Sequence, residues 1–222
     1  MILLSREQWF KYAFHLKKVW AHWILFSSGI FYKIRTEEPI QKKQAYLICP
    51  NHSSYLDIVL TNIAFPNYFH FMGKAELNNV PLLNIFFKRM NIAVNRSSIR
   101  DSHKAYRRAQ TDLTKGISIA IFPEATIPGC APTLGPFKTG AFKLAIEQQV
   151  PIVPITFLDN WKIFPDHGVN RFLVRPGFCR IIIHKPIPTI GMTEENMTEL
   201  RQRVHDLISK TLKDNDCLRK GC

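Results

Sequence analysis

The sequence has few acidic residues, no long apolar run and no closely paired cysteines. Its 222 residues carry 30 Lys and Arg against 17 Asp and Glu, which gives a formal net charge of +13. Residues 19–32 carry no formal charge, but these 14 residues fall short of the roughly 20 that cross a bilayer as a helix. The five cysteines form no C-x-x-C pair, which argues against a disulfide framework or a zinc site.

Several enzyme signatures are also absent. The chain has no H-E-x-x-H motif for a metal enzyme and no G-x-S-x-G motif for a serine hydrolase. It has no motif that reads RNA or DNA. The positive charge is partly clustered, with seven Lys or Arg against one Asp in residues 84–108. We therefore expect an anionic membrane surface or an acidic carrier as partner, and no nucleic acid.

Aromatic and basic residues crowd the first 34 residues, which we expect to be helical. Three of the four tryptophans lie there, with lysines between them. Such a helix can pack on a core, but Trp and Lys together favour the membrane interface. We assign residues 1–36 to an N-terminal interfacial helical segment, amphipathic and membrane-facing, and residues 37–222 to a second domain.

Short apolar runs alternate with amphipathic stretches in this second domain. Strands are expected at 45–49, 68–72, 90–94, 117–122, 150–157 and 179–187, and helices at 102–115, 138–149 and 193–213. This alternation predicts an α/β fold with a largely parallel central sheet flanked by helices. In such sheets ligands bind beyond the carboxyl ends of the strands.

The stretch CPNHSSYLDI places a histidine just after the first of these strands. His52 follows the strand that Pro50 ends, and Asp57 falls in or near the first turn of the next helix. An aspartate bonded to one imidazole nitrogen leaves the other nitrogen free to accept a proton. On spacing alone, a loop histidine beside a helix-terminal acid is the favoured explanation of the pair.

Two further segments place polar residues at the same rim of the predicted sheet. In IAIFPEATIPGC, Glu124 and Thr126 follow a buried strand, and in AVNRSS, Arg96 follows another. Glu124 could accept hydrogen bonds from a substrate hydroxyl, and Arg96 could hold a phosphate with two hydrogen bonds. The alternative is that Glu124 is a solvent-exposed acid in a turn and binds no substrate.

Taken in order, four blocks resemble one family. NHSSYLD (51–57), NR (95–96), FPEAT (122–126) and VPIVP (150–154) resemble the glycerophospholipid acyltransferases, most closely 1-acyl-glycerol-3-phosphate acyltransferase of the bacterial PlsC type. The resemblance covers residues 45–157, about half of the chain. Four ordered blocks are far more specific than any one of them.

The resemblance implies an O-acyltransferase in which His52 is the general base and Asp57 orients it. An acceptor hydroxyl attacks the acyl thioester directly, with no acyl-enzyme, no metal and no bound cofactor. The donor is acyl-CoA or acyl-carrier protein, and the acceptor is a lysophospholipid. The expected location is the cytoplasmic face of the cell membrane, peripheral or monotopic. Substrate binding is expected from Asn51, Arg96, Glu124, Thr126 and Lys138.

The third block departs from the family's usual Glu-Gly-Thr-Arg. Ala125 replaces the glycine, which matters if the turn needs a positive φ. Ile127 replaces the arginine and removes a cation from the implied phosphate site. Either another basic residue supplies that charge, or the acceptor is a lyso-aminolipid without the phosphate ester. The basic candidates are Arg96, Arg100, Lys138 and Lys143. A basic membrane-binding module without catalysis is the non-enzyme alternative.

Overall fold

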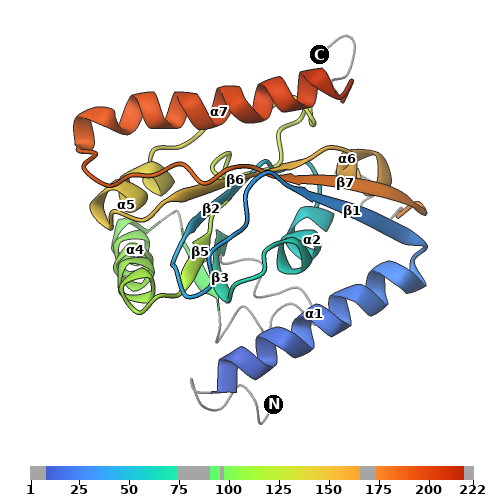
Figure 1. Ribbon diagram of the computed structural model, residues 1–222, viewed down its shortest axis with the longest axis horizontal. Coiled ribbons are helices and arrows are strands. Elements are labelled where there is room, and N and C mark those ends of the chain that lie inside the picture. Colours follow the sequence, from blue (N-terminus) through green and yellow to red (C-terminus); the bar gives the residue numbers. More distant parts are fainter. Residues whose placement is uncertain (1–8, 75–90, 96–97, 166–173, 218–222) are drawn as a thin grey trace.

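A seven-stranded, mostly parallel sheet with helices on both faces forms the centre of the protein. The computed structural model, shown in Figure 1, describes residues 9–74, 91–95, 98–165 and 174–217. The strand order is β1-β7-β6-β2-β5-β3-β4, and β6 with β7 is the only antiparallel pair in this sheet of described strands. The α/β prediction is therefore confirmed.

The strands are short apolar segments, several of them completely buried. Those predicted from residue 45 onward appear as β2 (Leu47–Pro50), β3 (Phe69–Lys74), β4 (Ile92–Val94), β5 (Ser118–Ala120), β6 (Ile152–Phe157) and β7 (Gly177–Ile183). Central strands β2, β5 and β6 are buried along their whole length. This burial on both faces explains why they read as continuous apolar runs.

The helices divide between the two faces of the sheet. Side chains of α1 (Phe10–Ser27) and α2 (Leu56–Ala64) share one apolar core, and those of α4 (Ile99–Thr114), α5 (Gly140–Glu147) and α7 (Met197–Asp214) share a second. Figure 1 shows α1 and α7 at opposite sides of the molecule. The short helices α6 (Asn160–Ile163) and η5 (Glu194–Asn196) complete the described elements.

The expectation that helix continues through residue 34 is wrong. Helix α1 ends at Ser27, and residues Ile30–Thr36 form strand β1, which pairs with β7 along its full length. Gly29 has a φ of 67°, a conformation that ends helices and that glycine adopts without strain. The sequence IFYKIRT then alternates apolar and polar residues at the period of a strand. The strand therefore belongs to the sheet, and only α1 remains of the predicted helical segment.

Helix α1 holds two neighbouring lysines on its inner side in different ways. Lys18 donates from Nζ to the carbonyl oxygen of Phe65, at the end of α2, over 2.8 Å. Lys17 is 5% exposed and has no hydrogen-bond or ion-pair partner among the described residues; its ammonium lies 5.4–5.7 Å from the ring centres of Phe14, Phe69 and Phe71. Burial lowers the pKa of Lys17 from 10.5 to about 7, helped by the charge of Lys18.

Replacing Lys17 by methionine is expected to change how stability depends on pH. The unfolded chain binds the Lys17 proton up to pH 10.5 and the folded chain only up to about 7, so protonation favours unfolding between these values. The free energy of unfolding of the wild type should therefore rise by about 2 kcal/mol more than that of Lys17→Met between pH 7 and pH 9. Chemical denaturation at both pH values measures this difference. The exposed control Lys33→Met should behave as wild type, and equal slopes for both variants would contradict the assignment.

Candidate active site

The candidate site lies at the carboxyl ends of neighbouring strands β2 and β5. The chain leaves β2 toward α2, on the face of α1, and leaves β5 toward α5, on the opposite face. Neighbouring parallel strands whose connections diverge in this way mark the position where open α/β sheets bind ligands. His52 follows β2 at this position, and Glu124 follows β5.

His52 and Asp57 form a hydrogen-bonded pair. Nδ1 of His52 lies 3.0 Å from Oδ2 of Asp57, whose side chain is completely buried. A carboxylate accepts hydrogen bonds, so the imidazole proton sits on Nδ1 and Nε2 carries the free lone pair. Nε2 has no partner among the described residues, and the His52 side chain is 13% exposed. The pair therefore has the arrangement of a general base with its orienting acid.

Asp57 is held in place by three more donors. As the spacing predicts, it lies in the first turn of α2, where Oδ2 accepts from the backbone N–H groups of Ser53 (2.6 Å) and Ser54 (2.9 Å). Its other oxygen, Oδ1, accepts from Nδ2 of Asn160 over 2.6 Å. Asn160 opens α6 just after β6, so one carboxylate connects the carboxyl ends of two strands.

Two other buried histidines contact a carboxylate, but both of their ring nitrogens are engaged. His70 lies 2.8 Å from Asp112 through Nδ1 and 2.6 Å from the hydroxyl of Tyr68 through Nε2. His184 contacts Glu37 at 3.2 Å and the hydroxyl of Thr156 at 2.7 Å. With no free nitrogen, each serves as a structural link between elements. Among these three histidine–carboxylate pairs, only His52 can take a proton from a ligand.

Phe122 and Glu124 support His52 from the β5 side. The Phe122 ring stacks on the imidazole, with 4.1 Å between ring centres and 19° between planes. Oε1 of Glu124 accepts the backbone N–H of His52 over 2.7 Å, and Oε2 accepts that of Gly135 over 2.8 Å. Burial raises the pKa of Glu124 to about 7; the charge of Asp57 adds to this, and the two backbone donors oppose it. Glu124 thus braces the histidine loop from within the protein.

The remaining predicted site residues take different positions. Asn51 is buried, and its amide donates to the carbonyl oxygen of Phe157 and accepts the N–H of the same residue. Thr126 and Lys138 have exposed side chains on the segments next to Glu124, where the Lys138 N–H donates to Pro123. Their roles in substrate binding stay predictions. Arg96 lies outside the described residues.

The structure adds Asn160, Phe122 and Gly135 to the site; of these, only Phe122 lies in a block that carries the family resemblance, and none was predicted as a site residue. Asn160 stands in LDNW, directly after the apolar run that forms β6, so the rule that located His52 and Glu124 would also have located it. Phe122 looked like one more strand residue. No sequence signal pointed to Gly135, because its contribution is a backbone N–H.

Both departures in the third block have structural consequences. Ala125 has a φ of 67°, so the turn after β5 does require the left-handed conformation that glycine adopts freely. Ile127 is half-buried on the same segment. Of the basic residues that could replace the missing arginine, Lys143 is paired with Glu194 at 3.1 Å and Glu147 at 3.8 Å. Lys138 is exposed beside the block itself.

Comparisons with known proteins identify the family of the chain. A family model described as Acyltransferase matches residues 32–158. The chain is 32% identical to an uncharacterized acyltransferase of Schizosaccharomyces pombe over 83% of this chain and 66% of that protein. It is also 32% identical to 1-acyl-sn-glycerol-3-phosphate acyltransferase of Saccharomyces cerevisiae, over 84% and 61%. The crystal structure of the 1-acyl-sn-glycerophosphate acyltransferase PlsC from Thermotoga maritima superposes with a TM-score of 0.79 at 22% identity, covering 97% and 85% of the two chains.

The chain belongs to the acyltransferase family, since the family model matches more than half of it. The likeness to the Thermotoga structure confirms the fold that the resemblance implied. The chain spans about two thirds or less of the length of the two fungal relatives.

Replacing Ala125 by glycine is expected to stabilise the protein. The left-handed conformation destabilises a residue with a Cβ by about 1–2 kcal/mol, and glycine removes this strain. The greater conformational entropy of glycine in the unfolded chain offsets about 0.4–1 kcal/mol of this gain. The free energy of unfolding should rise by about 0.5–1 kcal/mol, measured by chemical denaturation. Ala145→Gly removes the same methyl group from helix α5 and should lower it. A loss of stability in Ala125→Gly would show that the turn tolerates alanine without strain.

Proposed function

We propose that this chain moves a fatty acyl group from acyl-CoA or acyl-carrier protein to the free hydroxyl of a lysophospholipid. The first acceptor to consider is 1-acyl-glycerol-3-phosphate, with phosphatidic acid as product. The observation that carries the proposal is the His52–Asp57 pair at the ligand-binding rim of a chain in the acyltransferase family, in which Nε2 of His52 has no partner among the described residues. The name of the S. cerevisiae relative supports the choice of acceptor.

His52 would act as the general base in a direct transfer. The acceptor oxygen attacks the thioester carbonyl while its proton passes to Nε2, and Asp57 stabilises the imidazolium that forms. The tetrahedral intermediate then collapses. The C–S bond breaks, and the leaving thiolate takes the proton from His52, which leaves an ester and a free thiol. The protein forms no covalent bond with the acyl group.

The acceptor's phosphate needs a cation in place of the missing arginine at Ile127. Lys138 is the best placed of the described candidates, because its backbone is hydrogen-bonded to Pro123, next to Glu124, and its side chain is exposed. Lys143 is already paired with two carboxylates. Arg100 lies on α4, which follows β4, three strands away from the strand that precedes His52. A lyso-aminolipid is the second candidate acceptor, favoured by the replacement of that arginine with an apolar side chain.

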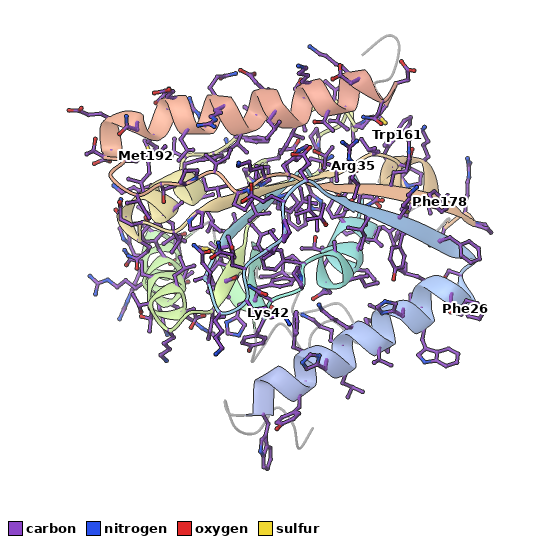
Figure 2. The ribbon with its side chains drawn as sticks, in the orientation of Figure 1. Phe26, Arg35, Lys42, Trp161, Phe178 and Met192 are labelled. Carbon is purple, nitrogen blue, oxygen red and sulfur yellow. The ribbon has the colours of Figure 1, made fainter. Side chains whose placement is uncertain are left out.

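Helix α1 supplies a surface for the membrane. Five large apolar side chains, each 53–69% exposed, follow one another at intervals of four and three residues along its outer side: Tyr12, Leu16, Val19, Trp23 and Phe26. Figure 2 labels Phe26 at the end of this helix. Spacing of four and three keeps them on one helix face, as in helices that lie in a membrane interface. None of the described helices is long and apolar enough to cross a membrane. We propose docking at the cytoplasmic face of an anionic membrane through this face of α1.

The catalytic proposal predicts that His52→Ala loses turnover and remains folded. Loss of general-base help should lower kcat by about 10²–10⁴. The assay follows thiol release from palmitoyl-CoA with lysophosphatidate and, separately, with a lyso-aminolipid. His15→Ala, an exposed histidine on α1, is the matched control. Normal turnover by His52→Ala would exclude the assigned role.

The same assay decides between the two acceptors. If Lys138 binds the phosphate, Lys138→Gln raises KM for lysophosphatidate and leaves KM for the lyso-aminolipid unchanged. An equal effect on both acceptors would exclude that role. A wild type that releases thiol with neither acceptor would favour the membrane-binding module without catalysis.

Membrane docking is tested by the double variant Trp23→Ser/Phe26→Ser in flotation with anionic vesicles. Removing both apolar side chains should lower the partition coefficient about a hundred-fold or more, because each large apolar group buried in the membrane contributes about 1.5–3 kcal/mol. Deletion of residues 1–34 would be a poor test, since it removes most of β1 from the sheet. Ile190→Ser, at an exposed apolar residue outside α1, is the control. Equal flotation of both variants would exclude α1 as the docking surface.

A further inference from the structure

The outer face of α4 carries a row of cations. Arg100, Lys104 and Arg107 are exposed and follow one another at intervals of four and three residues, so they lie on one side of the helix, opposite the buried Ala105 and Ala109. His103 lies among them. Asp101, in the first turn, is the only exposed acid in α4. We call Arg100, His103, Lys104 and Arg107 the α4 basic face.

The three permanent charges of this face are uncompensated within the described part of the chain. Arg100, Lys104 and Arg107 have no carboxylate within ion-pair distance there, while the neighbouring Arg108 lies 3.9 Å from Asp112. Cations that the protein leaves unpaired on one exposed helix face add up to a strong local potential. The amino-terminal end of the helix dipole adds to it near Arg100. This face therefore suits a partner with several negative charges.

An apolar side chain stands at the end of this face that is nearest the active site. Ile99, the first residue of α4, is 79% exposed. Helix α4 begins just after the carboxyl end of β4, on the same rim of the sheet as His52. Three strand spacings, about 14 Å in all, separate β4 from β2. An exposed apolar side chain next to a row of cations can contact the apolar part of a protein partner while the cations contact its acidic groups.

The α4 basic face lies away from the proposed membrane surface. Side chains of α4 pack in the core on the α5 and α7 side of the sheet, whereas α1 packs on the other side. Figure 1 shows α4 at the left edge of the molecule and α1 along its lower side. A flat bilayer that meets the outer side chains of α1 would leave α4 in solution. The partner of α4 is therefore a soluble molecule.

We propose that the α4 basic face, with Ile99, is the docking site for the acyl donor in the form of an acidic carrier protein. This inference rests on the proposed acyl transfer. A carrier protein holds its acyl group on a long flexible arm, so it can dock at α4 and deliver the thioester to His52, several strands away. The CoA head group also carries phosphate charges, but it offers no folded apolar surface to contact Ile99. Charge complementarity gives such a complex its association rate and its specificity.

The test removes the three cations and compares two donors. The variant Arg100→Gln/Lys104→Gln/Arg107→Gln is assayed with palmitoyl–acyl-carrier protein and with palmitoyl-CoA. Its matched control is Arg203→Gln/Lys210→Gln/Lys213→Gln, which removes three exposed cations from α7. We expect KM for the carrier-protein donor to rise on the order of ten-fold, with kcat unchanged, because three ion pairs with the carrier are lost and each contributes modestly at an exposed site. KM for palmitoyl-CoA should change less than two-fold, and the control should behave as wild type.

Direct binding separates this inference from the proposed function. The affinity of palmitoyl–acyl-carrier protein for the wild type and for both triple variants is measured by calorimetry without acceptor, so no turnover is needed. Weaker binding in the α4 variant alone supports the inference, even if acyl transfer is never observed. Failure of the wild type to bind the carrier protein overturns it, as does an equal loss in both variants. Loss of flotation on anionic vesicles with unchanged carrier binding would show that α4 contacts membrane instead.

Discussion

The geometry of the candidate site depends on one buried carboxylate. Asp57 accepts hydrogen bonds from the His52 ring, from two successive backbone N–H groups and from the amide of Asn160. A buried charge is costly unless it is fully hydrogen-bonded, and here these donors surround it. Because the donors come from the loop after β2 and from the start of α6, the carboxylate fixes the histidine relative to the sheet. Removing it would leave the loop without its common acceptor.

A second carboxylate repeats this arrangement on the other side of His52. Glu124 holds the backbone of the histidine and of Gly135, while Phe122 covers one face of the ring. The two acids therefore hold the ring nitrogen and the backbone nitrogen of one residue. Their negative charges disfavour each other, which is part of the reason why the pKa of Glu124 rises to about 7. Such repulsion between neighbouring acids, with the perturbed pKa that it causes, is typical of functional sites.

The pattern of apolar residues predicted the strands from β2 onward, because each of them is a short apolar segment bounded by turn residues. It fails at β1, because Phe31 and Tyr32 continue the aromatic pattern of the helix beyond Gly29, where the helix ends. His52, Asp57 and Glu124 were found because polar side chains after buried strands share a rim. The contribution of Gly135 could not be found this way, because a backbone N–H leaves no trace in the sequence. Nor could the sequence show that Lys17 faces inward.

The excess positive charge of the chain serves different purposes on the two sides of the sheet. On α1, Lys17 and Lys18 point inward, so the outer face is apolar and the attraction of this helix to a membrane would depend on its exposed Trp and Phe side chains. On α4, Arg100, Lys104 and Arg107 are exposed and have no carboxylate within ion-pair distance in the described part of the chain. A protein that used its net charge only to bind anionic lipid would place both sets on one surface. Their separation favours two partners that meet at the rim between them, where His52 lies.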